Sequence, residues 1–456
     1  MKTAIIRSSW MKGYGYRLDT MPYTRGALQT KIKLEELPLR KDTLGDITKS
    51  IHHAGRDARV WVEDPKYGVP FIGGSSLQKA DLSGLPLMSK EQVDKKPIFR
   101  IQKGYTLITR SGTIGKMAYA RDEMDGMACS EHVMRVVPDE SKILPGYLYA
   151  FLSSKFGVPL IVSGTYGAII QSIEPEHVLE CPVPRLEPAK EKAIHDLVEE
   201  AAQLRSEASE LRKQAIDEFS SAINRNSRHK RVLSTTVTSD ARIARRLDAH
   251  YHSFESQQGR LALSHYEHTQ SISDISHGVY SADRGSRKKV DSLEYGIPFL
   301  SSSVVFTTDP REDYLISKQS KKIDSFIIGE TDLLIPRSGS IGGIIGRAVF
   351  PLPNIVGYAA TEHLVHIRCK TKDDLYYLWT ALASEPGYHA ILSTAFGSAI
   401  PSLDCELIKN IKIPKLEMGR QRTIVSKVRK CALMAEEAIH KERKATQLLE
   451  ETLDNA

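Results

Sequence analysis

The stretch LITRSGTIG at residues 107–115 returns later in the chain as LIPRSGSIG at residues 334–342. In each copy an apolar, partly β-branched run ends at an arginine, Arg110 or Arg337, and a Ser-Gly pair follows at once. This order is typical of a β-strand that runs into a tight turn. Two copies of the same strand and turn predict a chain built from two similar domains.

Six further pairs of segments occur in the same order in both halves of the chain. The sequence YGVPFI at residues 67–72, for example, returns as YGIPFL at residues 295–300. The other pairs are residues 17–19 and 246–248, 44–47 and 272–275, 130–132 and 361–363, 167–173 and 397–403, and 184–187 and 414–417. Matches in one constant order indicate an internal duplication that covers nearly the whole chain.

The composition is that of a globular protein with a modest positive charge. The 456 residues include 63 Lys and Arg against 56 Asp and Glu, and 41% are hydrophobic. A chain of this length forms two or three compact domains, and its net charge of +7 permits an anionic partner without requiring one. The five cysteines form no Cys-x-x-Cys, which argues against a zinc site or a disulfide framework. No apolar run has the length of a membrane span or a signal peptide, so we expect a cytoplasmic protein that contacts no membrane.

Each copy combines a sheet-rich part with a charged helical part. Residues 105–109 and 132–137 are rich in β-branched residues and end at turn residues, whereas residues 147–154 and 377–384 have helical spacing. The fold class is therefore α+β, with two similar mixed α/β domains and two long helices. The expected boundaries are a first domain at 1–187, a central helix at 188–222, a basic linker at 223–245, a second domain at 246–416 and a C-terminal helix at 417–456.

Both long helices carry apolar residues at alternating spacings of three and four. This pattern is the narrow seam of a coiled coil, and a seam of this kind requires a partner helix. The seam residues are Ile194, Leu197, Ala201, Leu204, Ala208 and Leu211 in the first helix and Ile424, Val428, Cys431, Ala435, Ala438 and Leu449 in the second. We expect the helices to pair antiparallel, with a domain at each end of a rod about 45 Å long and a pseudo-twofold arrangement. In the alternative, each helix packs separately on its own domain.

With these features the chain resembles the specificity subunits of type I restriction-modification systems. The Arg-Leu-Asp openings at residues 17–19 and 246–248, the repeated Arg-Ser-Gly-x-Ile-Gly motif and the Pro-x-Leu-Glu entry into each helix carry the resemblance. It implies a non-catalytic subunit with two target recognition domains that read a split sequence in double-stranded DNA, while the helical pair sets the unread gap. It also implies two methyltransferase subunits that use S-adenosylmethionine, and restriction subunits that use ATP and Mg to translocate and cleave. The chain itself would hold no cofactor.

One departure from the family concerns the start of each helix. The family often has a Glu-Gln pair there, whereas this chain reads EPAKE at residues 187–191 and EMGRQ at residues 417–421. Contacts with the methyltransferase subunit at these positions are therefore not carried over.

Candidate DNA contacts lie at the repeated turn and in the basic stretches after the second strand of each copy. Arginine and lysine bind phosphates, and arginine also binds guanine with two hydrogen bonds. The candidates are Lys49, Arg56, Arg59, Arg110, Ser111, Thr113 and Lys116 in the first copy and Arg284, Arg287, Lys288, Lys289, Arg337, Ser338 and Ser340 in the second. In the alternative, Arg110 and Arg337 belong to structural turns and pair with Glu131 or Glu362, and the other cations form a solvated surface. The basic residues of the linker, such as Arg228 and Arg231, would bind either DNA or a partner subunit.

The candidate enzymatic motifs of the sequence lack residues that the corresponding chemistry requires. The turn at residues 110–116 lacks the first glycine of a phosphate-binding loop, and Met117 stands where that loop has Ser or Thr. The chain has no Asn/Asp-Pro-Pro-Tyr/Phe methyltransferase motif, and the acids of PDESK at residues 138–142 are adjacent rather than on separate strands. The histidines lack a matching cluster of acids or cysteines, so no metal site is predicted. The remaining alternatives are a DNA-specificity adaptor of another phage-defence assembly and a nuclease or methyltransferase with an unrecognised site.

Overall fold

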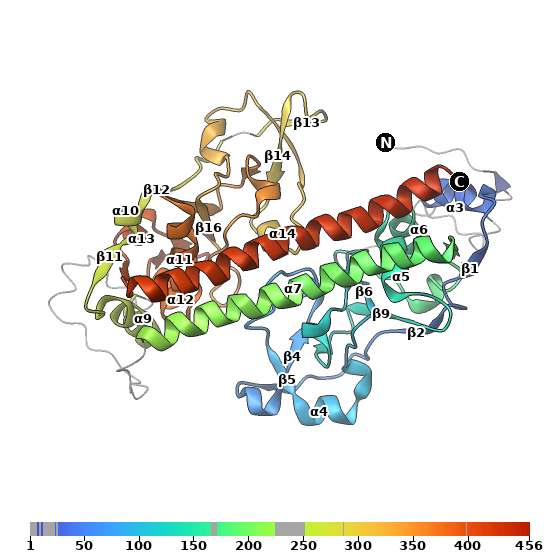
Figure 1. Cartoon of the computed structure of the whole chain (residues 1–456), viewed down its shortest axis with the longest axis horizontal. Coiled ribbons are helices and arrows are strands. Elements are labelled where there is room, and N and C mark those ends of the chain that lie inside the picture. Colours follow the sequence, from blue (N-terminus) through green and yellow to red (C-terminus); the bar gives the residue numbers. More distant parts are fainter. Residues whose placement is uncertain are drawn as a thin grey trace. The chain divides into compact units, whose positions relative to one another are not determined.

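The computed structural model describes residues 26–456 apart from 166–170, 224–250, 286 and 398, and also Arg7, Ser8, Met11 and Tyr23. The chain divides into two compact units, Met1–Ser206 with Glu437–Ala456, and Glu207–Glu436. Figure 1 traces the elements from blue at the N-terminus to red at the C-terminus. The repeated openings at 17–19 and 246–248, the aromatic Tyr166 with Gly167, and linker residues 224–245 lie outside the described part.

The first unit is built on a four-stranded antiparallel sheet of order β2-β9-β6-β7. Its strands are β2 (Thr48–His52), β9 (Val133–Pro138), β6 (Thr106–Thr109) and β7 (Met117–Tyr119). All residues of β6 and β9 are buried, so both faces of these strands are covered and the strands show no alternation of apolar and polar residues. The buried Arg135 of β9 is held by hydrogen bonds to the carbonyls of Phe99 and Cys129. This sheet is the centre of the domain and fixes the positions of the loops at its ends.

A second sheet of order β3-β5-β4-β8 lies in the same unit. Its strands are β3 (Trp61–Val62), β5 (Leu87–Ser89), β4 (Gly68–Ile72) and β8 (Ala128–Cys129), with β4 and β8 parallel and the other pairs antiparallel. The short helix α4 (Lys90–Lys95) follows β5 directly. Phe71 and Met88 of this sheet are buried in a core of their own with Phe99.

Helices cover the central sheet and lead the chain into the first long helix. They are α3 (Ala27–Glu36), α5 (Pro145–Ser153) and α6 (Gly157–Ser163), and the two-stranded pair β1 (Lys41–Thr43) and β10 (Pro182–Pro184) precedes α7 (Pro188–Ile223). The Tyr147 hydroxyl of α5 donates a hydrogen bond to the Pro184 carbonyl at 2.6 Å. This bond ties the domain to the strand from which α7 departs.

The second unit repeats this topology. Its central sheet has the order β12-β18-β16, and its other sheet has the order β13-β15-β14-β17 with a parallel β14-β17 pair. The strands are β12 (Ser276–Ser281), β18 (Leu364–Cys369), β16 (Asp332–Pro336), β13 (Lys289–Val290), β15 (Tyr314–Ser317), β14 (Gly296–Leu300) and β17 (Ala359–Ala360). The predicted pair of similar mixed α/β domains is therefore confirmed.

The remaining elements of the second unit include the strand pair β11-β21, which is the counterpart of β1-β10. The helices are α9 (Phe254–Ser264), α10 (Ile272–Ile275), α11 (Lys372–Ala383), α12 (Glu385–Leu392) and α13 (Cys405–Lys409), and the strands are β11 (Thr269–Ser271), β21 (Lys412–Pro414), β19 (Ala395–Phe396) and β20 (Ser402–Leu403). Tyr377 donates to the Pro414 carbonyl at 2.7 Å, the counterpart of the Tyr147 bond. The chain then enters the second long helix, α14 (Met418–Asp454).

The long helices, green and red in Figure 1, pack against each other within each unit. In the first unit Lys441 of α14 forms an ion pair with Glu200 of α7 at 2.6 Å, and Arg205 of α7 pairs with Glu442 of α14. A small hollow at the start of α7 is lined by Lys190 together with residues from the end of α14, so the two segments run antiparallel there. In the second unit Lys427 pairs with Glu218 at 2.5 Å. The prediction that the long helices pair with each other is confirmed.

The buried face of these helices is wider than the narrow seam that the sequence predicts. Of the predicted seam residues, Ile194, Ala201, Ala208, Ile424, Val428, Cys431, Ala438 and Leu449 are buried, while Leu197, Leu204, Leu211 and Ala435 are partly buried. Val198 and Ala202 are buried as well and join a core that includes Tyr147 and Leu152 of the first domain. The reason is that in the first unit the helices pack on the domain as well as on each other. No helix in the described part of the chain is long and apolar enough to cross a membrane.

Candidate nucleic-acid interface

Antiparallel pairing brings several of the predicted contact residues, but not Lys49, to one end of each central sheet. In the first domain the end of β6 lies beside the start of β9, with Thr109 opposite Val133, and β2 ends at His52 opposite Arg135. In the second domain Pro336 at the end of β16 lies opposite Leu364, and Ser281 at the end of β12 lies opposite Val365. We call the residues gathered here the polar edge of each domain: Arg59, Arg110, Ser111, Glu131 and His132 in the first, and Arg287, Arg337, Ser338, Glu362 and His363 in the second.

A repeated arginine, glutamate and phenylalanine form the centre of each polar edge. Arg59 forms an ion pair with Glu131, and its guanidinium lies over the Phe71 ring, 5.0 Å from the ring centroid. At the equivalent positions of the repeat, Arg287 donates to both oxygens of Glu362 at 2.6 and 2.7 Å and lies 4.9 Å from the Phe299 centroid. The two predicted contacts Arg59 and Arg287 are therefore held in one orientation by a carboxylate and by an aromatic face.

The environment keeps both glutamates charged at neutral pH. Burial by itself would raise the pKa of Glu131, but a hydrogen bond from its own backbone amide and the bond and charge of Arg59 outweigh burial and lower that pKa. For Glu362, burial is likewise outweighed by its backbone amide and by Arg287, and the pKa is lowered. Each polar edge thus contains a fixed carboxylate whose charge an arginine neutralises.

Arg110 faces the protein interior rather than the surface. It is buried, and its guanidinium donates to the Ile173 carbonyl at 2.9 Å and to the Glu131 carbonyl at 3.3 Å. It also forms an ion pair with Glu174, whose other oxygen lies 3.0 Å from Nε2 of His53. The carboxylate that pairs with Arg110 is thus Glu174 and not Glu131, and we propose a structural role for this arginine. Its counterpart Arg337 is less buried and donates to the Ser281 hydroxyl at 3.2 Å.

The turn after each arginine is held on one side and exposed at its tip. Ser111 and Ser338 form isolated β-bridges with Ser172 and Ser402, respectively. The Ser111 hydroxyl lies 2.8 Å from Nδ1 of His132, and the Ser338 hydroxyl lies 2.8 Å from that of Ser402.

The glycines of the first turn allow the left-handed backbone that the turn needs. Gly112 and Gly115 have φ values of 77° and 82°, which side chains other than glycine rarely adopt. Thr113 and Lys116 of this turn are exposed, as is Ser340 of the second turn.

The remaining predicted cations fall into two groups. Arg56 in the first domain and Arg284 and Lys288 in the second are exposed in the segments that follow β2 and β12, and the exposed Lys289 lies 4.1 Å from the Tyr314 ring centroid. Lys49 does not belong with them. It lies at a bulge between Thr48 and Ser50, where β2 faces the far end of β9, and is therefore at the opposite end of the sheet from Arg110.

Several edge residues were not selected from the sequence as functional. They are His53, His132, Ser172, Glu174, His363 and Ser402. For His132 and His363 a signal was present, because each ends a repeated Ser/Thr-Glu-His triplet at residues 130–132 and 361–363. Phe396 of β19 is 47% exposed.

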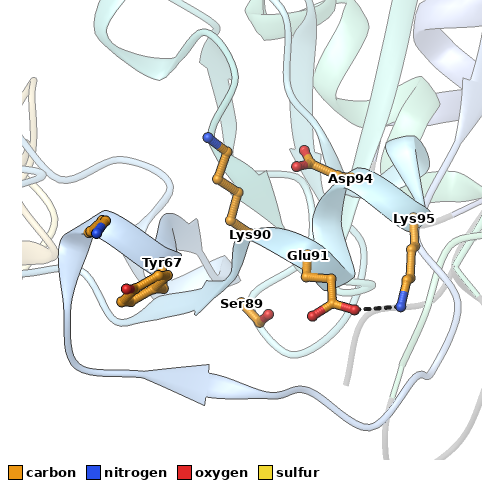
Figure 2. A pocket seen from close by; sticks show the side chains of 7 residues that line it. Tyr67, Ser89, Lys90, Glu91, Asp94 and Lys95 are labelled. Carbon is orange, nitrogen blue, oxygen red and sulfur yellow. Dashed lines mark hydrogen bonds and ion pairs between the residues drawn. The ribbon is translucent and has the colours of Figure 1, made fainter.

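A hollow of about 520 Å³ lies beside the second sheet of the first domain. Its lining residues are Lys66, Tyr67, Ser89, Lys90, Glu91, Asp94 and Lys95. Figure 2 shows the ion pair between Glu91 and Lys95, whose atoms are 2.6 Å apart. Because Glu91 and Asp94 offset most of the lysine charge, this hollow lacks the concentrated positive charge of a phosphate site. Within the described ranges, no three His, Cys, Asp or Glu side chains come together as a metal site requires.

The first domain is similar to a known family of protein domains. Residues 41–191 match the family model of the Type I restriction modification DNA specificity domain. This range runs from the start of β1 into the first turn of α7 and includes the whole first polar edge. No curated protein matches the chain.

Three solved structures are similar to the chain over most of its length. The S subunit of a type I restriction-modification system from M. genitalium is 12% identical, with 92% of this chain and 95% of that chain covered and a TM-score of 0.36. The HsdS subunit from Thermoanaerobacter tengcongensis is 14% identical, with 91% and 96% covered and a TM-score of 0.28. A chain from a structure of the assembly and conformational transition of the type I R-M system is 14% identical, with 91% and 98% covered and a TM-score of 0.29.

The family model matches the first domain, and the second domain is a repeat of the first. In the second unit the sheet β13-β15-β14-β17 has the order of β3-β5-β4-β8, and the central sheet β12-β18-β16 has the order of β2-β9-β6 without an equivalent of β7. The same arginine, glutamate and phenylalanine lie at its polar edge. The similarity to the Type I restriction modification DNA specificity domain covers residues 41–191 of the 456-residue chain.

Proposed function

We propose that each polar edge binds one part of a bipartite target in double-stranded DNA. The chain would be the DNA specificity subunit of a type I restriction-modification system, without catalytic activity of its own, and the family match over residues 41–191 supports this. The observation that carries the proposal is the repetition of one polar edge in two domains of a single chain. A protein with two such edges has two equivalent surfaces, as a split target requires.

The exposed cations beside each edge would supply the contacts. In the first domain Lys116 belongs to the turn and Arg56 lies in the segment after β2, and in the second domain Arg284, Lys288 and Lys289 lie in the segment after β12. These side chains are long, charged and exposed, so they suit phosphate oxygens and, for arginine, the major-groove edge of guanine. Arg59 and Arg287 would reach DNA from a fixed position, because their acidic and aromatic partners already orient them.

The catalytic steps would belong to partner subunits. We propose that the chain recruits two methyltransferase subunits, which bind S-adenosylmethionine and methylate adenine, and restriction subunits, which use ATP and Mg to translocate and cleave. The long helices would set the unread gap between the two half-sites. Both are continuous through their described residues, at 188–223 and 418–454.

Methylome sequencing tests this function directly. A host that expresses the chain together with a type I methyltransferase subunit should show adenine methylation within one two-part motif. Deletion of this chain alone should remove methylation from the whole motif, while the purified chain alone should neither cleave DNA nor transfer a methyl group. Methylation that persists without the chain, or methyl transfer by the isolated chain, would contradict the proposal.

A further inference from the structure

The two polar edges share some residues and differ in others. If the proposed function holds, the two domains face different base pairs but the same sugar-phosphate backbone. Residues common to both edges are therefore suited to backbone contacts that set position, and residues that differ are suited to base contacts that set specificity. The shared pairs are Arg56 with Arg284, Arg59 with Arg287, Ser111 with Ser338, and His132 with His363. The differing positions include Val60 and Trp61, where the second copy has Lys288 and Lys289, and Lys116, where it has Gly343.

From this division we infer that His132 and His363 are equivalent contacts to the DNA backbone, one in each domain. Each imidazole stands at the start of the central strand of its sheet, β9 or β18. The two side chains are 52% and 47% exposed, although the residues around them are largely buried. This inference rests on the proposed function and adds two residues to the proposed surface.

The backbone of each histidine is fixed in the same way. The His132 carbonyl accepts from the Arg110 amide at 2.9 Å, and the His363 carbonyl accepts from the Arg337 amide at 2.7 Å. The amide of His132 donates to the Ser130 hydroxyl at 2.8 Å, and that of His363 donates to the Thr361 hydroxyl at 3.4 Å. An exposed side chain on so constrained a backbone is presented at a defined position beside the Arg-Ser-Gly turn.

The charges around each imidazole also suit a phosphate contact. The neighbouring carboxylate lies 3.3 Å from Nε2 in His132 and 3.8 Å in His363. A carboxylate alone would repel phosphate, but Glu131 and Glu362 are each paired with an arginine. Because an arginine neutralises each acid, no net negative charge is left beside the imidazole. In the first domain Ser111 lies 2.8 Å from the other ring nitrogen and adds a hydroxyl that a phosphate oxygen accepts from.

The test uses the full chain assembled with its methyltransferase subunits and two DNA duplexes. One duplex carries the target found by methylome sequencing, and the other has both half-sites scrambled. The variants are H132A, H363A, and H132Q and H363Q, which keep a side-chain donor. The control is H268A, because His268 is also exposed beside a glutamate, Glu267, but lies ahead of β11 and outside the polar edge.

If the histidines contact the DNA backbone, their replacement should lower the affinity for both duplexes equally. H132A and H363A should each weaken binding to both duplexes about tenfold, since a hydrogen bond to a charged group has about this effect. The glutamine variants should recover most of the affinity, H268A should bind like the unchanged protein, and all variants should unfold at unchanged temperatures.

Other outcomes would overturn the inference. Unchanged binding by both alanine variants would show that the histidines do not contact DNA. Loss on the target duplex alone would identify base contacts instead, and a lowered unfolding temperature would identify a structural role. If the unchanged complex fails to prefer the target duplex, the proposed function itself is wrong, so the two failures are distinguishable.

Discussion

Replacement of Glu362 by Gln tests whether the acid at the polar edge holds its arginine in place. Glu362 is 11% exposed, and both of its oxygens accept from Arg287, which is 26% exposed. Gln keeps one acceptor but removes the charge. A charge-assisted hydrogen bond contributes about 1.5–3 kcal/mol, and partial exposure of the arginine reduces this figure, so we expect E362Q to lower the free energy of unfolding of the second unit by about 1–2 kcal/mol.

The assay is urea unfolding of the full chain over a range of pH, with D283N as the matched control. Asp283 also pairs with a cation in the second unit, but both partners are 60% exposed, so D283N should cost no more than about 0.5 kcal/mol. The pKa of Glu362 is lowered in the folded protein. The contribution of the pair is therefore present above the unfolded pKa of about 4.3 and is lost as pH falls through the lowered pKa.

The difference between E362Q and the unchanged protein should accordingly be constant near neutral pH and shrink in acid. In the assembled complex, E362Q should also weaken binding to the half-site of the second domain, because Arg287 loses its orientation. Equal unfolding free energies for E362Q and the unchanged protein at neutral pH would refute the idea that this acid fixes Arg287.

Three further predictions concern the second unit, the helix junctions and the long helices. Burial alone would raise the pKa of Asp332, but hydrogen bonds from His366 and Arg368 hold that pKa well below its usual range. D332N should therefore lower the free energy of unfolding by about 2–4 kcal/mol near neutral pH, and this difference should shrink below about pH 3.9. Equal acid-unfolding curves for D332N and the unchanged protein would contradict this. G157A and G387A should each destabilise the protein by about 3 kcal/mol in thermal unfolding. The added Cβ would lie 2.2 Å from the Phe151 carbonyl oxygen in G157A and 1.9 Å from the Ala381 carbonyl oxygen in G387A. In the control G285A the added Cβ meets no atom within 4 Å, so its stability should be unchanged. Insertion of four residues into both long helices should lengthen the gap in the methylated motif by nearly two base pairs, since each helix grows by about 6 Å and a base pair rises about 3.4 Å; altered half-sites with an unchanged gap would contradict the proposed spacing role.

Most of the fold can be predicted from the periodicity and the internal repetition of the sequence. The repeated LITRSGTIG and LIPRSGSIG segments predict a strand and a turn, and the structure has β6 and β16 ending just before the two arginines. The apolar spacing from residue 194 predicts a long helix with a helical partner, and α7 contacts α14 in each unit. These features follow from sequence because they depend on neighbouring residues and on two segments with matching patterns.

The side-chain partners at the polar edge depend instead on tertiary contacts. Arg110 was a candidate DNA contact, yet Glu174 from a distant segment neutralises it inside the domain. Lys49 was grouped with Arg56 because both are basic and close in sequence, but the strand β2 separates them along its length. Spacing in the sequence does not show which end of a strand meets which loop, since strand register decides that.

The central claim is that each domain reads its own half of the target. The most direct measurement is methylome sequencing of a host in which Lys288 and Lys289 of the second domain are replaced together by Ala, beside a host with Lys116 of the first domain replaced in the same way. We predict that each variant loses or relaxes one half of the motif and keeps the other half unchanged. Loss of both halves in both hosts at normal protein levels, or an unchanged motif in either, would contradict the claim.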